Sequence, residues 1–136
     1  MSHGPTDALI LEQVAAAVIY ANKAGVIERW NAAAAAMFGF TATEALGQHL
    51  DLVIPEHLRK AHWRGFDAAM ENGKTRLGGR PTMTRALHKT GQKLYVEMSF
   101  ALVTDATGSV LGSVAVARDA TERVERDKAA VVPPRS

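Results

Sequence analysis

The side chain with the clearest chemical potential in this sequence is the imidazole of His62. It lies in a predicted helix, residues 57–71, whose limits are marked by Pro55 before it and Gly73 after it. Apolar residues recur around His62 at three- and four-residue spacing, which places them on its face of the helix. These residues are Leu58, Phe66, Ala69 and Met70. An imidazole on such a face is either a packed side chain bonded to a carbonyl group or a ligand-binding group.

No other group of residues forms a recognisable catalytic or phosphate-binding motif. The chain has no cysteine, which excludes disulfides, thiolate zinc sites and thiol nucleophiles. It also lacks a glycine-rich phosphate loop, Gly-x-Ser-x-Gly and His-Glu-x-x-His. Residues 78–80, Gly-Gly-Arg, are interpreted as a glycine turn leading into a strand. The acidic residues are scattered, and we expect a protein that is not an enzyme.

Composition and charge restrict the partners and the location that this protein can have. The 136 residues are enough for one domain. The net charge of +2 provides no basic field for nucleic acid or anionic lipid. The first residues lack the apolar segment of a signal peptide, and the longest apolar run, residues 14–21, is too short to span a bilayer. We expect a cytoplasmic protein that binds neither nucleic acid nor membrane.

The elements that would position His62 follow from hydrophobic spacing, caps and turns. The predicted order is two strands, four helices and three strands, with one further helix at each end. Asn31 is a strong N-cap for an alanine-rich helix, and Thr41 with Glu44 forms a capping box for a short helix. The predicted strands are residues 17–22, 26–30, 81–88, 94–104 and 110–118, and the flanking helices are residues 6–16 and 119–130. The tail after residue 130 is expected to be disordered.

Several motifs in this order resemble the PAS domain family. GVIERWNAAAAAMFGFTATEALGQHLDLVIPEHLR resembles the first half of such domains, HKTGQKLYVEMSF their Lys-x-Gly turn and next strand, and VARDATER their closing motif. The resemblance implies an α+β fold, with a five-stranded antiparallel sheet, helices on one face, and flanking N- and C-terminal helices. It also implies a flanking helix in residues 1–16, a sensor domain in 17–119 and an output helix with its tail in 120–136.

In PAS domains a ligand lies between the sheet and the long helix. Alternation along the fourth predicted strand places Val96, Met98 and Phe100 on the face toward the core. Light-sensing members of the family attach flavin or coumarate through a cysteine, and this chain has none. Both covalent chemistries are therefore excluded.

The stretch around His62 resembles the haem-binding PAS domains of bacterial oxygen sensors. In those, a proline is followed seven residues later by the proximal histidine, then by Gly-Lys or Gly-Glu and a further glycine; here Pro55, His62, Gly73-Lys74 and Gly79 have this spacing. The resemblance implies haem b, with His62 as the ligand of its iron. The apolar walls that it implies are Leu58, Phe66 and Met70 on the helix, with Val96, Met98 and Phe100 on the strand.

The residues expected on the other side of such a haem depart from the family pattern. Eighteen and twenty residues after His62 stand Arg80 and Thr82. Phosphodiesterase-type sensors have a methionine ligand and an oxygen-binding arginine there, and kinase-type sensors have the arginine at the second position. Arg80 is therefore either a distal donor or a solvated residue at the strand edge. Met83 and Met98 are alternative distal ligands or core side chains.

Two hypotheses of function follow. The first is a sensor domain that binds a ligand, with haem and a diatomic gas as leading candidates, and that signals to an effector such as a histidine kinase or cyclase. The second is a ligand-free dimerisation or docking module whose own side chains fill its core. In both, the apolar stripe of the N-terminal helix is expected to form a homodimer or to pack on the sheet of the same chain. That stripe consists of Leu9, Ile10, Val14 and Ala17.

Overall fold

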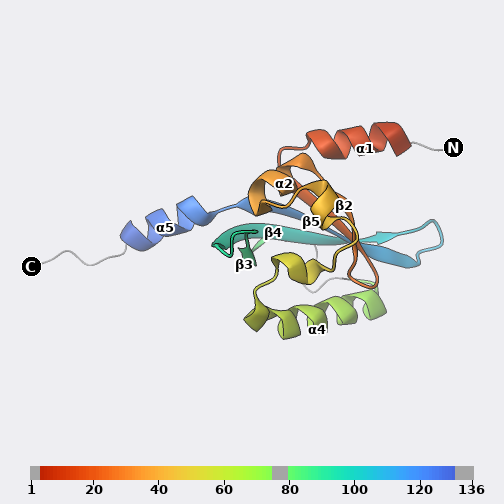
Figure 1. The fold of residues 1–136 in the computed structure, drawn as a ribbon. Helices are drawn as coiled ribbons and strands as arrows, with labels where there is room; N and C mark the ends of the chain where they lie inside the picture. The colour runs from red at the N-terminus through yellow and green to blue at the C-terminus, as the bar shows by residue number, and fades with distance from the viewer. Residues whose placement is uncertain (1–3, 75–79, 131–136) are drawn as a thin grey trace, which may run out of the picture.

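The fold is built on a five-stranded antiparallel sheet, as predicted, and is described for residues 4–74 and 80–130 of a computed structural model. The strands lie in the order β2-β1-β5-β4-β3 (Figure 1). Neighbouring strands pair antiparallel throughout, so that β3, β4 and β5 form a meander beside the β1–β2 hairpin. The strand bounds are β1 Ala17–Asn22, β2 Ile27–Trp30, β3 Thr82–Leu87, β4 Lys93–Thr104 and β5 Val110–Asp119.

Local signals start and stop the helices between β2 and β3. The Asn31 side chain accepts a hydrogen bond from an amide of the first turn of α2, and the predicted capping box of Thr41 and Glu44 opens α3. Gly39 and Gly73 end α2 and α4 with positive φ angles of 82° and 73°, which glycine adopts without steric cost. The helices are α1 Gly4–Gln13, α2 Ala32–Phe38, α3 Ala42–Ala45, η1 Leu50–Val53, α4 Glu56–Asn72 and α5 Thr121–Ala130.

The inner face of the sheet carries the core, because side chains alternate between the two faces of each strand. Ile19 of β1, Val96 of β4 and Ala117 of β5 point to this face and are buried. Side chains of α2, α3 and η1 complete the core, including Phe38, which is fully buried. The helices between β2 and β3 therefore cover one face of the sheet, as predicted.

The N-terminal helix differs from its prediction. It spans Gly4–Gln13, rather than residues 6–16, and Ala17 belongs to β1 and is fully buried instead of extending the helical stripe. The side-chain amide of Asn31 donates to three backbone carbonyl groups, those of Leu11, Val14 and Ala16. The helix therefore ends at Gln13, and the backbone carbonyl groups near its end bind this amide. A contact between such distant segments cannot be read from local spacing.

At the C-terminal end, α5 is joined to β4. The Ala120 amide donates to the Tyr95 carbonyl at 2.7 Å, and the Tyr95 amide donates to Thr121 Oγ1 at 3.0 Å. Figure 1 shows α5 leaving the end of the sheet opposite to the projecting β4–β5 hairpin. The predicted disordered tail and the glycines at 78–79 lie outside the described residues. Within residues 4–74 and 80–130, none of the helices combines the length and apolar character needed to traverse a lipid bilayer.

Candidate functional site

The candidate site is organised by α4, whose N-terminal end is fixed to the segment before it. Pro55 precedes the first helical residue, where its missing N–H costs nothing. Arg59 Nε donates to the Ile54 carbonyl at 3.0 Å, and Arg59 Nη2 donates to the Asp51 carbonyl at 3.2 Å. These bonds tie the first turns of α4 to η1 and set the direction of the helix past the sheet.

The face of α4 that bears His62 is half-buried along its length. Within Glu56–Asn72, all of which the structure describes, no side chain is fully buried. The half-buried residues include each member of the predicted stripe together with Arg59 and Trp63, and the other positions of the helix are exposed. The stripe members are Leu58, His62, Phe66, Ala69 and Met70. The apolar face of this 17-residue helix therefore remains partly accessible.

His62 has an unsatisfied ring nitrogen. Its Nδ1 is buried without a hydrogen-bond partner among the described residues, so the carbonyl bond expected of a merely packed histidine is absent at this atom. Burial lowers the pKa of the imidazole from its ordinary value of 6.5, and the Asp51 carboxylate opposes this shift. Since a buried polar atom without a partner is costly, the arrangement suits an imidazole that binds something else.

Aromatic rings surround His62 on α4. The His62 ring lies edge-on to Trp63, with centroids 4.6 Å apart, and stacks on Phe66 at 6.0 Å. Trp63 also contacts His49 at 4.3 Å, and its Nε1 donates to Asp51 Oδ1 at 2.7 Å. Trp63, His49 and Asp51 were absent from the predicted site. The available signal was a tryptophan adjacent to the histidine on an amphipathic helix, but it lies off the predicted stripe.

The sheet residues predicted to face the site lie on the inner face. Val96 is fully buried in the core, and Met98 and Phe100 are half-buried and pack against it. Thr82, the first residue of β3, pairs with Met98 and is also half-buried. The inner face is therefore closed at Val96 and becomes more accessible further along β4.

Two expectations about neighbouring residues need correction. Met83 pairs with Glu97, on the outer face of the sheet, and 42% of its surface is exposed, so it cannot serve as a ligand opposite His62. His88, expected to face solvent, is half-buried and packs so closely on Gly39 that a Cβ there would lie 2.6 Å from its ring. His49 and His57 are exposed, as expected.

Arg80 is exposed and precedes β3. The preceding glycine of the motif, Gly79, lies outside the described residues. Strand β3 begins at Thr82, so the alternation of side chains along the strand does not extend to Arg80. Its role as a distal donor stays a prediction.

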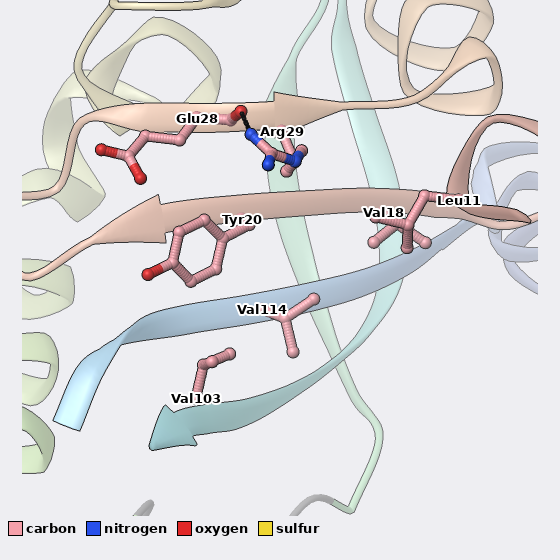
Figure 2. Close-up of a pocket in the computed structure, with 7 residues that line it drawn as sticks. All are labelled: Leu11, Val18, Tyr20, Glu28, Arg29, Val103 and Val114. Carbon is pink, nitrogen blue, oxygen red and sulfur yellow. Dashed lines mark hydrogen bonds between the residues drawn. The ribbon is translucent and has the colours of Figure 1, made fainter. Parts of the chain in front are cut away.

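A separate depression of about 320 Å³ lies on the outer face of the sheet. Figure 2 shows its side chains arising from β2, β1, β5 and β4, with Leu11 of α1 at one end. The lining residues are Leu11, Val18, Tyr20, Glu28, Arg29, Val103 and Val114. This depression and His62 lie on opposite faces of the sheet. We assign the candidate site to the inner face, because the unsatisfied imidazole is there.

Residues 11–125 match the model of a family described as the PAS fold. This chain belongs to the PAS family. PAS domains are sensory modules of signalling proteins that generally do not catalyse reactions. They commonly occur with kinase or other effector domains and commonly dimerise.

Among curated proteins, the chain is similar to the oxygen sensor protein DosP of Escherichia coli strain K12. The two are 30% identical over 111 residues, which cover 82% of this chain and 14% of DosP. The chain thus spans a small part of that relative, so only the PAS region is compared.

Solved structures show the same fold. The PAS domain of a protein from Colwellia psychrerythraea superimposes with a TM-score of 0.75 at 21% identity, covering 87% of this chain and 97% of that one. The PAS domain of Bordetella pertussis BvgS gives 0.68 at 18% identity, covering 92% and 91%. The expected PAS fold is confirmed.

Proposed function

We propose that this PAS domain is a sensor that binds haem b through His62 and responds to a diatomic gas. The observation that carries the proposal is the buried, unpartnered Nδ1 of His62 on a half-buried apolar helix face. The similarity to a protein named as an oxygen sensor supports it. Haem, when bound, would be held by His62 and would supply an iron that can bind a small diatomic gas.

The residues of this chain would bind the group in a specific way. Burial lowers the pKa of His62, so its imidazole stays neutral at neutral pH, and the neutral form is the one that ligates a metal. The half-buried apolar side chains would cover the flat faces of the macrocycle. They are Leu58, Phe66 and Met70 of α4 and Met98 and Phe100 of β4, with Val96 closing the core behind them.

A haemin titration tests the proposal. Wild-type protein should give a stoichiometric Soret shift, and His62→Ala should abolish it while the far-UV circular dichroism stays native. His57→Ala is the matched control, because His57 is an exposed histidine on the same helix, and it should bind haemin like the wild type. The absence of a Soret shift in wild-type protein would end the haem proposal.

Oxygen affinity should depend on Arg80. A cationic donor near the bound gas forms a charge-assisted hydrogen bond worth about 1.5–3 kcal/mol. Arg80→Ala should therefore raise the oxygen off-rate about tenfold or more, measured by flash photolysis or stopped flow. Thr82→Val, which removes the other polar group at these positions, is the comparison. Unchanged kinetics in Arg80→Ala would place the arginine outside the pocket.

We also propose a homodimer formed through α1, which either a haem sensor or a ligand-free docking module would use. Leu9 and Ile10 are 62% and 58% exposed, and Val14 is 37% exposed. Leu11 borders the outer depression and is half-buried, so packing on the same chain accounts for Leu11 but leaves Leu9 and Ile10 exposed. Leu9→Glu with Ile10→Glu should convert a dimer to a monomer in sedimentation at micromolar concentration. Wild-type protein that sediments as a monomer would refute the dimer.

A histidine kinase or a cyclase is the kind of effector that we propose for this sensor, and the cytoplasm is the proposed location. Support comes from the family, whose domains commonly occur with kinase or other effector domains. Fusion of α5 to a kinase module would test the first point through gas-dependent phosphorylation, with His62→Ala as the unresponsive control.

A further inference from the structure

We propose that Trp63 is the positioning residue of the candidate site: its indole holds the His62 ring and joins it to the β1–β2 turn. The inference rests on the proposed function only in taking His62 as the ligand. It concerns a residue that contacts the ligating side chain, not the ligand itself.

The indole of Trp63 is held on several sides at once. Its Nε1 donates to Asp51 Oδ1 at 2.7 Å. Its ring contacts the rings of His49 at 4.3 Å and Phe66 at 4.9 Å. An aromatic side chain with its polar atom bonded and its ring packed between other rings has little freedom to turn.

The indole also packs directly against the backbone of the β1–β2 turn. Gly25 has a φ of +81°, and a Cβ there would lie 2.4 Å from the Trp63 ring. The Gly25 carbonyl in turn accepts a hydrogen bond from the Leu50 amide at 2.9 Å. Trp63 therefore bridges α4, η1 and the turn, and any displacement of the indole must move one of them.

His62 depends on these neighbours for its orientation. Its Nδ1 has no hydrogen-bond partner among the described residues, and its ring contacts the rings of Trp63 and Phe66. Trp63 meets it at an interplanar angle of 88°, and Phe66 stacks at 29°. The Phe66 ring in turn packs against the Trp63 ring. Removing the indole would take away one direct contact and the support of the other.

The consequence is a mechanical link between site and hairpin. A ligand that moves His62 would shift the imidazole toward or away from the indole. The indole is hydrogen-bonded to Asp51 and packs against Gly25, so the shift would be transmitted to both. The β1–β2 turn would then respond to occupancy of the site. Because β1 pairs with β5 along its whole length, from Ala17↔Ala117 to Asn22↔Gly112, the turn is connected to the strand that leads into α5.

The first test uses the protein without any ligand. Histidine-selective NMR should show a single, sharp set of ring signals for His62 in the wild type, and Trp63→Leu should broaden or double that set. Arg64→Ala, an exposed change on the same helix, is the matched control and should leave it unchanged. A folded Trp63→Leu protein with unchanged His62 signals would overturn the proposal.

A second pair of variants keeps the test decisive if Trp63→Leu does not fold. Asp51→Asn retains an oxygen that accepts from the indole, whereas Asp51→Ala removes it. The alanine variant should disorder the His62 signals and increase hydrogen exchange at the β1–β2 turn, and the asparagine variant should restore wild-type behaviour. Equal behaviour of Asp51→Ala and wild type would contradict the proposal.

Haemin then serves as the probe for the liganded state. Supporting residues around a metal ligand are typically worth about 10- to 100-fold in affinity, so Trp63→Leu should weaken haemin binding by about that factor. Wild-type protein that does not bind haemin would remove the proposed function but leave the NMR test of positioning intact. Haemin binding and axial spectra identical to wild type in a folded Trp63→Leu protein would refute positioning alone.

Discussion

The inner face of the sheet has two regions that differ in how completely they are packed. Under α2, side chains close the core: Ala17, Ala34 and Phe38 have no exposed surface. Under α4, Phe66, Met98 and Phe100 are only half-buried, although they touch the same core. The α4 helix is longer than α2, with 17 residues against 7, yet it buries no side chain fully.

Under the proposed function, this difference separates stability from binding within one small domain. Close packing under α2 supplies the apolar burial that holds the fold together. The partly accessible surfaces under α4 contribute less to that burial, and they combine the apolar walls and the polar group that a small-molecule site needs. The unpartnered nitrogen of His62 is on the accessible side.

The largest expected effect is on the closed region. Phe38→Ala should destabilise the protein by about 3–5 kcal/mol, since it removes a fully buried aromatic ring and leaves a cavity. Urea denaturation followed by circular dichroism measures this change. A loss of unfolding free energy below about 1 kcal/mol is the size expected of a surface change or a modest repacking. Such a result would mean that the two regions do not differ in how much they stabilise the fold.

Substitutions of Asn31 test which hydrogen bonds hold the closely packed region under α2 to α1. Its side chain is 4% exposed and accepts from the amides of Val18 and Ala34, at 2.9 Å and 3.0 Å. Asn31→Ala should cost about 2–4 kcal/mol, because it removes a helix cap and leaves several buried groups unpaired.

Asn31→Asp separates the two roles of that side chain. The carboxylate keeps both acceptor bonds but cannot donate to the carbonyl groups of Leu11 in α1 and of Val14 and Ala16 after it. Hydrogen exchange should therefore increase in α1 while α2 stays protected. Uniform exchange across both helices would show instead that the donor bonds support the whole core.

The open region should respond differently to a similar deletion. Phe66→Ala removes a half-buried ring, so its cost in the absence of ligand should be about 1 kcal/mol, half or less of a full burial. Haemin affinity should fall by a clearly measurable factor in the same protein. A cost as large as that of Phe38→Ala would show that the region under α4 is closed as well.

The smallest effect concerns the two tyrosines on the outer face. Burial raises the pKa of Tyr20 above its ordinary value of 10.0. A hydrogen bond from Lys128 of α5 lowers the pKa of Tyr95 below the same value. The phenolate should therefore form first at Tyr95 as pH rises, which an ultraviolet absorbance titration would resolve as two steps.

Lys128→Ala isolates the cause of the lower step. Without the cation, the pKa of Tyr95 should rise and the two steps should approach each other, while the Tyr20 step stays in place. Tyr95→Phe identifies the lower step by removing it. An unchanged lower step in Lys128→Ala would show that Lys128 does not bind the Tyr95 hydroxyl in solution.

Local chemistry in the chain determined much of this protein. Asn31 at the start of an alanine run, the Thr41–Glu44 capping box, and Gly73 after α4 act over a few residues, so each could be predicted and each is confirmed. The alternation of Val96, Met98 and Phe100 was likewise sufficient to assign the inner face of β4. The helical spacing around His62 identified the half-buried stripe of α4.

Tertiary structure alone decided the early end of α1, the placement of Met83 on the outer face, and the role of Trp63. The end of α1 depends on an amide of Asn31, which follows β2. Trp63 owes its surroundings to Gly25 and Asp51, which come from two other segments. The physical reason is common to these cases: hydrogen bonds and ring contacts between segments distant in sequence leave no periodic trace in either segment, whereas caps, turns and apolar spacing do.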